Sequence, residues 1–171
     1  MSLRLHGELT VFPDVGLVHC RAAKLDPKSK PADHLKLWIE HLALQLTDAP
    51  APRRSYLIGE DGTWVFQEVA DAREMLASLL EHFAAGLLAP LRWFPKASFA
   101  FLRGDDKHPP LELAREAWDG VEGSDFNQGE KDDPYFDLCF RNDPEPLNEA
   151  FQALAPPIAG PLLDSQEKEK A

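Results

Sequence analysis

Cysteine and long apolar runs are both scarce in this chain. Only two cysteines occur among 171 residues, which excludes a disulfide framework and a cysteine-rich metal site. No apolar run approaches the ~18 residues that a membrane span needs. The N-terminal residues also lack the apolar core of a signal peptide. We therefore expect no membrane association and a place in the cytosol.

Basic residues are outnumbered as well. The chain has 18 Lys and Arg against 29 Asp and Glu, a net charge of −11, which is unusual for an autonomous nucleic-acid-binding protein. The imbalance is uneven, because residues 21–54 hold seven basic and four acidic residues, whereas residues 111–171 hold five and fifteen. A mildly basic early surface and an acidic late one suit a piece of a larger assembly. Ordinary solvated faces would give the same pattern.

The hydrophobic pattern of the first half predicts a mixed α and β structure. Strands are expected at Glu8–Phe12 and Gly16–Cys20, joined by a turn that contains Pro13 and Asp14. A helix is expected over residues 33–46, with Asp33 as its N-cap. Apolar residues at helical spacing predict its buried stripe. That stripe consists of Leu35, Trp38, Ile39, Leu42 and Leu46.

The rest of the chain continues this pattern. A hairpin is expected from residues 55–59 and 63–67 around Asp61-Gly62, followed by a helix over residues 71–88 that Pro90 ends. Residues 91–102 are expected to be partly extended. Short helices are expected at residues 110–118, 133–140 and 147–155. We predict one α+β domain over residues 1–171, with a small mixed or antiparallel sheet flanked by helices, a core at 7–163 and a frayed polar tail at 164–171.

Motifs for common chemistries are missing. Six histidines are present, but none forms an HExxH motif, and the seven-residue spacing of His34 and His41 is too long for one ion. Neither a phosphate-binding glycine loop nor a Gly-x-Ser-x-Gly elbow occurs. The acidic stretch 129–133 either binds a divalent cation or, as we favour, ends in a helix N-cap at Asp132 or Asp133. We predict no metal and no cofactor.

A series of short blocks resembles the C-terminal region of the RecC family, the gamma subunits of bacterial exodeoxyribonuclease V. The order and spacing of the blocks hold over residues 7–163. The main blocks are Lys24-Leu25, Trp38–Leu44, Leu57–Gly59, Asp61–Trp64, Phe94–Ser98, Gly129–Phe136 and Phe140-Arg141. Because chains of that family are far longer, the resemblance implies an isolated C-terminal domain.

The resemblance implies a fold like that of the PD-(D/E)XK nucleases with a degenerate active site. Related active nucleases carry carboxylates on one strand, and a carboxylate followed by lysine on the next. The resemblance makes Thr10, His19 and Arg21 the equivalent positions here, and a Gln-x-x-x-Tyr pair is replaced by Leu37 and His41. Hydrolysis at such sites needs carboxylates to hold Mg²⁺. Arginine is a poor proton shuttle, so we predict no catalytic residue.

The resemblance also implies a role and partners. The domain is expected to be a non-catalytic, structural and DNA-guiding part of a RecBCD-type helicase–nuclease in the bacterial cytoplasm. Its partners would be a RecB-type helicase–nuclease, a RecD-type helicase and DNA during double-strand-break repair and recombination. Basic side chains bind phosphates without reading sequence, and tryptophan can anchor an interface. The candidate contact residues are Arg21, Lys24, Lys28, Lys30, Lys36, Arg53, Arg54, Arg92, Trp93 and Lys96.

Two other hypotheses stay open at this point. The chain could be an active Mg²⁺-dependent nuclease that uses a different carboxylate set, such as Glu8, Asp14 and Glu40. It could also be an independent protein-interaction module that shares the fold and recruits partners through its acidic C-terminal half.

Overall fold

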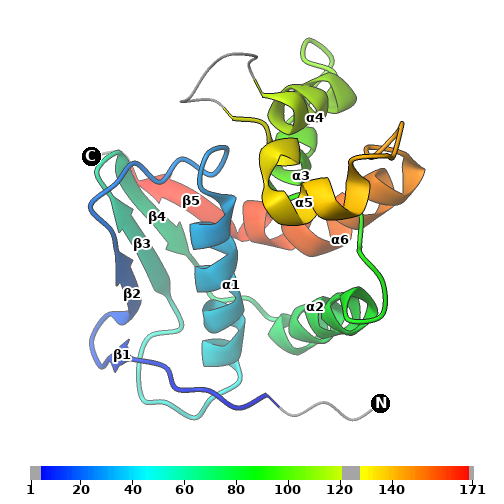
Figure 1. Cartoon of the computed structure of the whole chain (residues 1–171). Coiled ribbons are helices and arrows are strands. Elements are labelled where there is room, and N and C mark those ends of the chain that lie inside the picture. Colours follow the sequence, from blue (N-terminus) through cyan, green and yellow to red (C-terminus); the bar gives the residue numbers. More distant parts are fainter. Residues whose placement is uncertain (1–4, 121–127, 170–171) are drawn as a thin grey trace.

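A five-stranded sheet with helices against one of its faces forms the larger part of the molecule (Figure 1). The computed structural model describes residues 5–120 and 128–169. The strands lie side by side in chain order, from β1 to β5. Their bounds are Val11–Phe12, Gly16–Cys20, Ser55–Gly59, Gly62–Phe66 and Gln166–Glu169. Strands β2 and β3 are parallel and the other neighbours are antiparallel, so the prediction of a small mixed sheet is confirmed.

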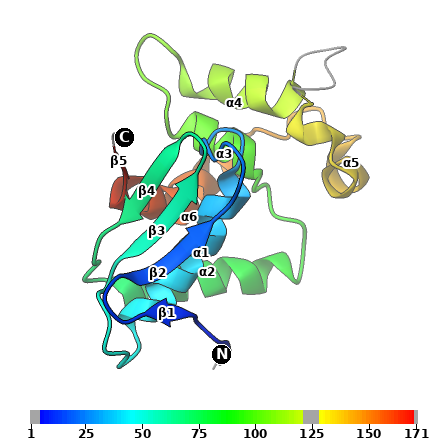
Figure 2. The same cartoon turned by 90° about the vertical axis from the view of Figure 1, so that its left-hand side faces the viewer.

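Helix α1, at Pro31–Gln45, makes the crossover between the parallel strands β2 and β3. In Figure 2 the sheet faces the viewer, with α1, α2 and α6 behind it. Helix α2 spans Ala72–Gly86 and follows β4. None of the described helices is long and apolar enough to cross a bilayer.

The remaining helices follow α2 in the chain. They are α3 at Pro95–Phe101, α4 at Pro110–Asp119, a 3-10 turn η1 at Glu130–Asp132, α5 at Pro134–Phe140 and α6 at Glu149–Ser165. The structure thus has two lobes. The sheet lobe contains β1–β5, α1 and α2, and the helical lobe contains α4, η1, α5 and the first half of α6.

Each lobe has its own core, and two helices take part in both. Leu17, Trp38 and Phe66 belong to the core of the sheet lobe, whereas Phe94 and Trp118 belong to that of the helical lobe. Helix α3 supplies Phe99 to the first core and Ala97 to the second. Helix α6 supplies Ala159 and Leu162 to the first and Phe151 to the second. The two cores are therefore joined through α3 and α6.

Two turns at the sheet require glycine. Gly16 opens β2 with φ +107°, and a Cβ there would lie 2.2 Å from the carbonyl oxygen of Arg54. Gly62 has φ +137° and follows the two-residue turn Glu60-Asp61 of the β3–β4 hairpin. Positive φ is costly for residues with a Cβ, so glycine stabilises both turns. The hairpin matches the predicted one to within a residue.

The predicted first strand was too long, since only Val11 and Phe12 pair with β2. Leu9 instead packs against the sheet-lobe core. The start of α1 was also misplaced, because Pro31 occupies its first turn and Asp33 lies inside the helix. Proline suits that position because the first N–H groups of a helix have no partner within it.

The predicted buried stripe of α1 was partly wrong. Ile39 and Leu46 are 43% and 41% exposed, whereas His34 and His41 are fully buried. A stripe predicted from apolar residues alone leaves out histidines whose ring nitrogens have hydrogen-bond partners inside the protein. The interior face of α1 is accordingly more polar than its sequence pattern indicates.

Three predictions for the later chain were also wrong. Residues 95–101 form the helix α3, whereas residues 91–102 were predicted to be partly extended and no helix was predicted there. Helix α6 continues past Pro156 and Pro157, although prolines remove donors from a helix, because Ile158, Ala159 and Leu162 continue its buried stripe. The tail is not frayed at residues 166–169, which pair with β4 as strand β5. The expected tail residues 170–171 lie outside the described part of the chain.

Candidate functional site

The three positions that the resemblance compares with nuclease ligands lie around β1 and β2. Thr10 is exposed just before β1, His19 lies in β2 and Arg21 follows that strand. His19 Nε2 lies 2.8 Å from a carboxylate oxygen of Glu40 on α1. The guanidinium of Arg21 donates to both carboxylate oxygens of Asp33, at 2.9 and 2.8 Å. Glu40 and Asp33 of α1 are therefore each bound to a nitrogen-containing side chain, Glu40 to His19 in β2 and Asp33 to Arg21 just after it.

The helix position compared with the nuclease tyrosine holds a core histidine. His41 Nε2 lies 3.0 Å from the carbonyl oxygen of Gln67 and can only donate to it. Its Nδ1 then accepts from the hydroxyl of Ser55 at 2.8 Å. Burial lowers the pKa of His41 to about 4, against a weaker opposite effect of the bond to Gln67. His41 is therefore a neutral, structural residue at pH 7.

His34 is a second buried histidine on the same helix face. Its Nε2 donates to the carbonyl oxygen of Leu25 at 2.7 Å, and its Nδ1 lies 2.7 Å from the side-chain amide of Gln166 in β5. Burial lowers the pKa of His34. Because its partners come from the loop after β2 and from the last strand, His34 links α1 to both.

The alternative carboxylate set is only partly brought together. Glu8 and Glu40 both line a groove of about 550 Å³ between the N-terminal segment and α1, whose other walls include the apolar Ile39 and Leu46. Asp14 lies in the turn between β1 and β2 and does not line this groove. Within residues 5–120 and 128–169, no three His, Cys, Asp or Glu side chains gather as a potential metal-ligand group.

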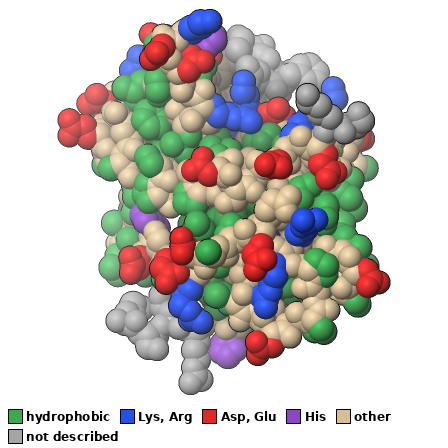
Figure 3. Space-filling view, turned by 180° about the vertical axis from the view of Figure 1, so that it is seen from behind, with side chains coloured by type: hydrophobic (Ala, Val, Ile, Leu, Met, Phe, Trp, Pro, Cys, Tyr) green, Lys and Arg blue, Asp and Glu red, His purple; other side chains and the backbone are tan. Residues whose placement is uncertain are grey.

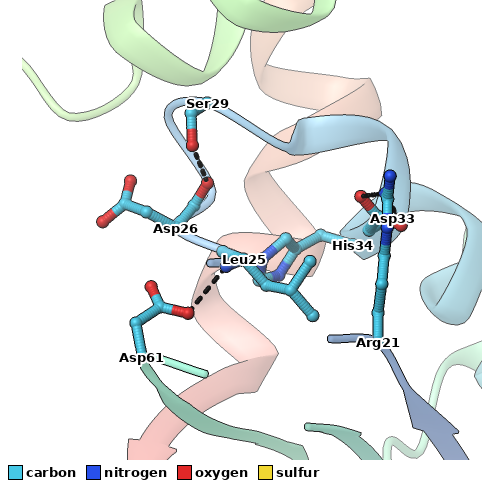
Figure 4. A network of polar contacts seen from close by, with 7 residues as sticks. All are labelled: Arg21, Leu25, Asp26, Ser29, Asp33, His34 and Asp61. Carbon is cyan, nitrogen blue, oxygen red and sulfur yellow. Dashed lines mark hydrogen bonds and ion pairs between the residues drawn. The ribbon is translucent and has the colours of Figure 1, made fainter. Parts of the chain in front are cut away.

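Residues 21–30, here named the basic loop, connect β2 to α1 and are held by a network of polar contacts (Figure 4). The Leu25 N–H donates to the carboxylate of Asp61 at 2.6 Å, and the Leu25 carbonyl accepts from His34. The hydroxyl of Ser29 donates to the carbonyl of Asp26 at 3.2 Å. Leu25 itself is fully buried. These contacts fix the loop against α1 and the β3–β4 turn.

The basic loop presents three lysines on this fixed backbone. Lys24, Lys28 and Lys30 are exposed, and none of the three forms an ion pair within the described ranges of the chain. Two basic residues that sequence reasoning missed lie beside the loop. Arg103 is 3.9 Å from the Asp26 carboxylate. Lys168 lies over the ring of Trp64, at 4.6 Å from its centroid.

Only the fold could reveal these two neighbours, since they come from the end of α3 and from β5. The pKa of Asp61 responds to basic side chains of both the basic loop and β5. Its pKa is lowered first by the hydrogen bond from the Leu25 N–H and then by the nearby charges of Lys168 and Lys24. The contact candidates Lys36 and Arg54 are also exposed, but they lie in α1 and at the opposite end of β2.

Arg53 and Arg92, two of the remaining candidates, hold parts of the fold together. The guanidinium of Arg53 donates to the carbonyls of Leu44 and Thr47 and so caps the end of α1. Arg92 pairs with Asp143, donates to the Glu145 carbonyl at 3.1 Å and lies over the ring of Phe140.

Trp93 is half-buried and packs against the sheet-lobe core. Lys96 is half-buried at the start of α3. The candidates thus form separate groups, of which the basic loop is the most exposed.

The acidic stretch of residues 129–133 serves as a set of helix caps. Asp133 accepts from the Tyr135 N–H at 2.9 Å at the start of α5, as the favoured interpretation of this stretch predicts. Glu130 is 5% exposed and accepts from the N–H groups of Lys96 and Ala97, both at 2.9 Å. Sequence reasoning missed this second role because 33 residues separate Glu130 from Ala97.

The chain is similar to proteins of one known family. The family described as the RecC C-terminal domain matches residues 1–106, which include the sheet through β4, α1, α2 and α3. The chain belongs to the RecC C-terminal domain family. It is also similar to the RecBCD enzyme subunit RecC of Escherichia coli (strain K12), with 30% identity over 143 residues. That match covers 77% of this chain and 12% of the E. coli protein.

This RecC-type domain therefore corresponds to a small part of its relative. The family resemblance drawn from the sequence blocks is confirmed. The matched region contains the ion pairs between β2 and α1, the basic loop and both buried histidines.

Proposed function

We propose that this RecC-type domain is a non-catalytic, structural and DNA-guiding part of a RecBCD-type helicase–nuclease complex. Family membership and the similarity to a RecBCD subunit support this role. The proposal includes a RecB-type subunit, a RecD-type subunit and DNA as partners, in the bacterial cytoplasm, during double-strand-break repair and recombination.

The contacts of His19 with Glu40 and of Arg21 with Asp33 support the non-catalytic part of the proposal. A hard cation such as Mg²⁺ needs carboxylate and water oxygens. At the compared positions the chain has the hydroxyl of Thr10, the imidazole of His19 and the guanidinium of Arg21, and the last two bind the nearby acids Glu40 and Asp33. Mg²⁺ would have to displace these partners to reach the carboxylates. The residues present therefore do not fit a two-carboxylate metal site.

We also propose that the fold is a degenerate relative of the PD-(D/E)XK nucleases. The antiparallel β1–β2 pair, the crossover through α1 and the parallel pairing of β2 with β3 support this assignment. In this arrangement His19 and Arg21 lie on and directly after one strand, as the active-site residues of such nucleases do.

The basic loop is the part of the surface best suited to DNA phosphates. Lys24, Lys28 and Lys30 are exposed on a backbone that is already fixed, so binding would order little more than their side chains. The chain as a whole is acidic, which suits contact with DNA inside an assembly better than free DNA binding.

An apolar patch on α2 supports docking onto protein. Phe83, Leu87 and Leu88 are 62%, 70% and 89% exposed near the end of this helix. A groove of about 380 Å³ runs beside them and is also lined by Leu91 and Trp93. Figure 3 shows hydrophobic patches between scattered acidic side chains on the back of the molecule. Exposed apolar patches commonly mark protein interfaces.

Two measurements test the proposal as a whole. Co-purification with the RecB-type and RecD-type subunits of the same genome should recover a complex, and the chain alone should not cleave DNA with Mg²⁺. Cleavage that EDTA abolishes, without any partner bound, would show that an active site exists. Restoring carboxylates with Thr10→Asp and His19→Asp provides a matched probe, because gain of cleavage would support the nuclease-like geometry.

Charge reversal tests the basic loop. A variant with Lys24→Glu, Lys28→Glu and Lys30→Glu should weaken DNA engagement by the assembled complex and flatten its salt dependence by about one phosphate contact per lysine lost. Fluorescence anisotropy at several salt concentrations measures both. Arg73→Glu on α2, compared with each single lysine reversal, is the control for the change in net charge, and thermal unfolding checks the fold. Unchanged assembly, DNA affinity and unwinding would remove the loop from the proposal.

A further inference from the structure

Glu130 is the most buried carboxylate among the described residues and makes a contact that neither the family nor the proposed function explains. It is 5% exposed, and its two oxygens accept separately from the N–H groups of Lys96 and Ala97. These N–H groups belong to the first turn of α3, where the N-cap residue Phe94 offers no side-chain acceptor. A residue that is distant in sequence therefore caps α3.

The segment that carries Glu130 is fixed from several sides. A Cβ on Gly129 would lie 2.5 Å from the carbonyl oxygens of Trp118 and Asp119, so the chain passes directly against the end of α4. The Gly129 N–H donates to Asp132 at 3.1 Å, and Lys131 pairs with Asp119 at 3.0 Å. The chain on both sides of Glu130 is therefore held in place against the end of α4.

The charged groups around Glu130 act in opposite directions. Burial raises its pKa to about 7, which outweighs the two backbone hydrogen bonds and the attraction of Lys96, and Asp133 at the start of α5 raises it further. Lys131 and Asp119 neutralise each other on the η1 and α4 sides. Asp132 is engaged with the Gly129 N–H.

Each protonation state of Glu130 is unfavourable in one respect. The ionised carboxylate satisfies both N–H groups but holds a charge inside the protein. The neutral acid removes the charge, but its hydroxyl oxygen accepts a hydrogen bond more weakly than a carboxylate oxygen does. The α3 hydrogen bond to that oxygen should then weaken. The two states should therefore differ in how strongly Glu130 holds the start of α3.

We propose that Glu130 is a proton-responsive clamp that holds the start of α3 strongly through both oxygens when ionised and less strongly through one of them when protonated. Because α3 supplies residues to both cores, the strength of the clamp affects how firmly α3 connects the sheet lobe to the helical lobe. The inference does not depend on the proposed role in a RecBCD-type complex.

Amide NMR of the full 171-residue chain tests the clamp. The Lys96 and Ala97 N–H signals should titrate together between pH 5.5 and 8.5 with a common midpoint near 7. In Glu130→Gln, an isosteric variant, neither signal should titrate in that range. Signals that stay constant in the wild type, or that move equally in the variant, would overturn the proposal.

Two further variants keep the test decisive if Glu130→Gln does not fold. Asp133→Asn removes a repelling charge and should lower the common midpoint, whereas Lys96→Met removes an attracting charge and should raise it. Glu116→Gln, an exposed change on α4, is the control and should leave the midpoint in place. Equal midpoints in all three variants would also overturn the clamp.

Discussion

The two lobes bury polar groups of opposite kind. The sheet lobe encloses two neutral histidines, His34 and His41, whereas the helical lobe encloses the acid Glu130. Burial lowers the pKa of the histidines and raises that of the acid. The same physical cause, the cost of a charge away from water, thus makes one lobe sensitive to acid and the other to base. Stability should accordingly be greatest at intermediate pH.

The largest expected effect concerns the aromatic core of the helical lobe. Phe94 contacts the rings of Trp118, Phe140 and Phe151, at centroid distances of 4.3, 5.1 and 5.9 Å. Phe94→Ala should lower the free energy of unfolding by about 3–5 kcal/mol, because it leaves a cavity among these rings. Urea unfolding measures this. Phe83→Ala on the exposed part of α2 is the control, with an expected change within about 0.5 kcal/mol.

Phe94→Ala also tests how strongly α3 and α6 join the lobes. If the lobes unfold as one unit, tryptophan fluorescence and far-UV circular dichroism will give the same urea midpoint in the variant. Separate midpoints would show that the helical lobe opens by itself.

Acid should destabilise the sheet lobe through His41. A histidine whose folded-state pKa is about 4 stabilises the fold above pH 6.5, and that contribution is lost as the pH falls toward 4. The loss amounts to roughly 3 kcal/mol, to which His34 adds in the same direction. Urea unfolding at pH 7 and pH 4.5 measures it. His41→Gln should reduce the loss, and His108→Gln, at an exposed site, should leave it unchanged.

Base should destabilise the helical lobe through Glu130. Its folded-state pKa of about 7 lies above the ordinary 4.5, so its contribution to stability is present below pH 4.5 and is lost as the pH rises through 7. The loss is again roughly 3 kcal/mol. Comparing the unfolding free energies at pH 4.5 and 8.5 in the wild type and in Glu130→Gln isolates this effect. An equal loss in both proteins would contradict it.

The smallest expected change in the free energy of unfolding comes from removing the ion pair between Arg21, just after β2, and Asp33 of α1. The Arg21 side chain is 53% exposed, so water screens the attraction. A double-mutant cycle with Arg21→Ala and Asp33→Ala should give a coupling of about 1 kcal/mol or less. A coupling above about 2 kcal/mol would mean that this pair, and not the buried groups, fixes α1 against the sheet.

The regular elements could be predicted from the sequence, but their contacts could not. Alternation and turn residues identified β2, β3 and β4, and helical spacing identified α1, α2, α4 and α5. The burial of His34 could not be predicted, since its partners Leu25 and Gln166 come from a loop and from a tail that reads as polar. Helix α3 was missed because its cap, Glu130, lies 34 residues after Lys96 in the first turn of the helix.

For the candidate site, too, the residues could be predicted from the sequence but their contacts could not. The compared nuclease positions and the exposed lysines could be named from residue types and order alone. The ion pairs that bind Glu40 and Asp33 required the packing of α1 on β2. The structural use of Arg53 likewise required the three-dimensional positions of the Leu44 and Thr47 carbonyls.

The pairing of β5 with β4 has a consequence for synthesis on the ribosome. Thr63 pairs with Glu169, so the free edge of β4 has no partner until nearly all of the described chain has been made. Until then, β4 exposes unpaired backbone groups that a neighbouring nascent chain could bind. The charged residues of β5, which follow α6 directly, then close this edge in the finished domain. The last strand thus ends the interval in which the nascent domain is most prone to aggregate.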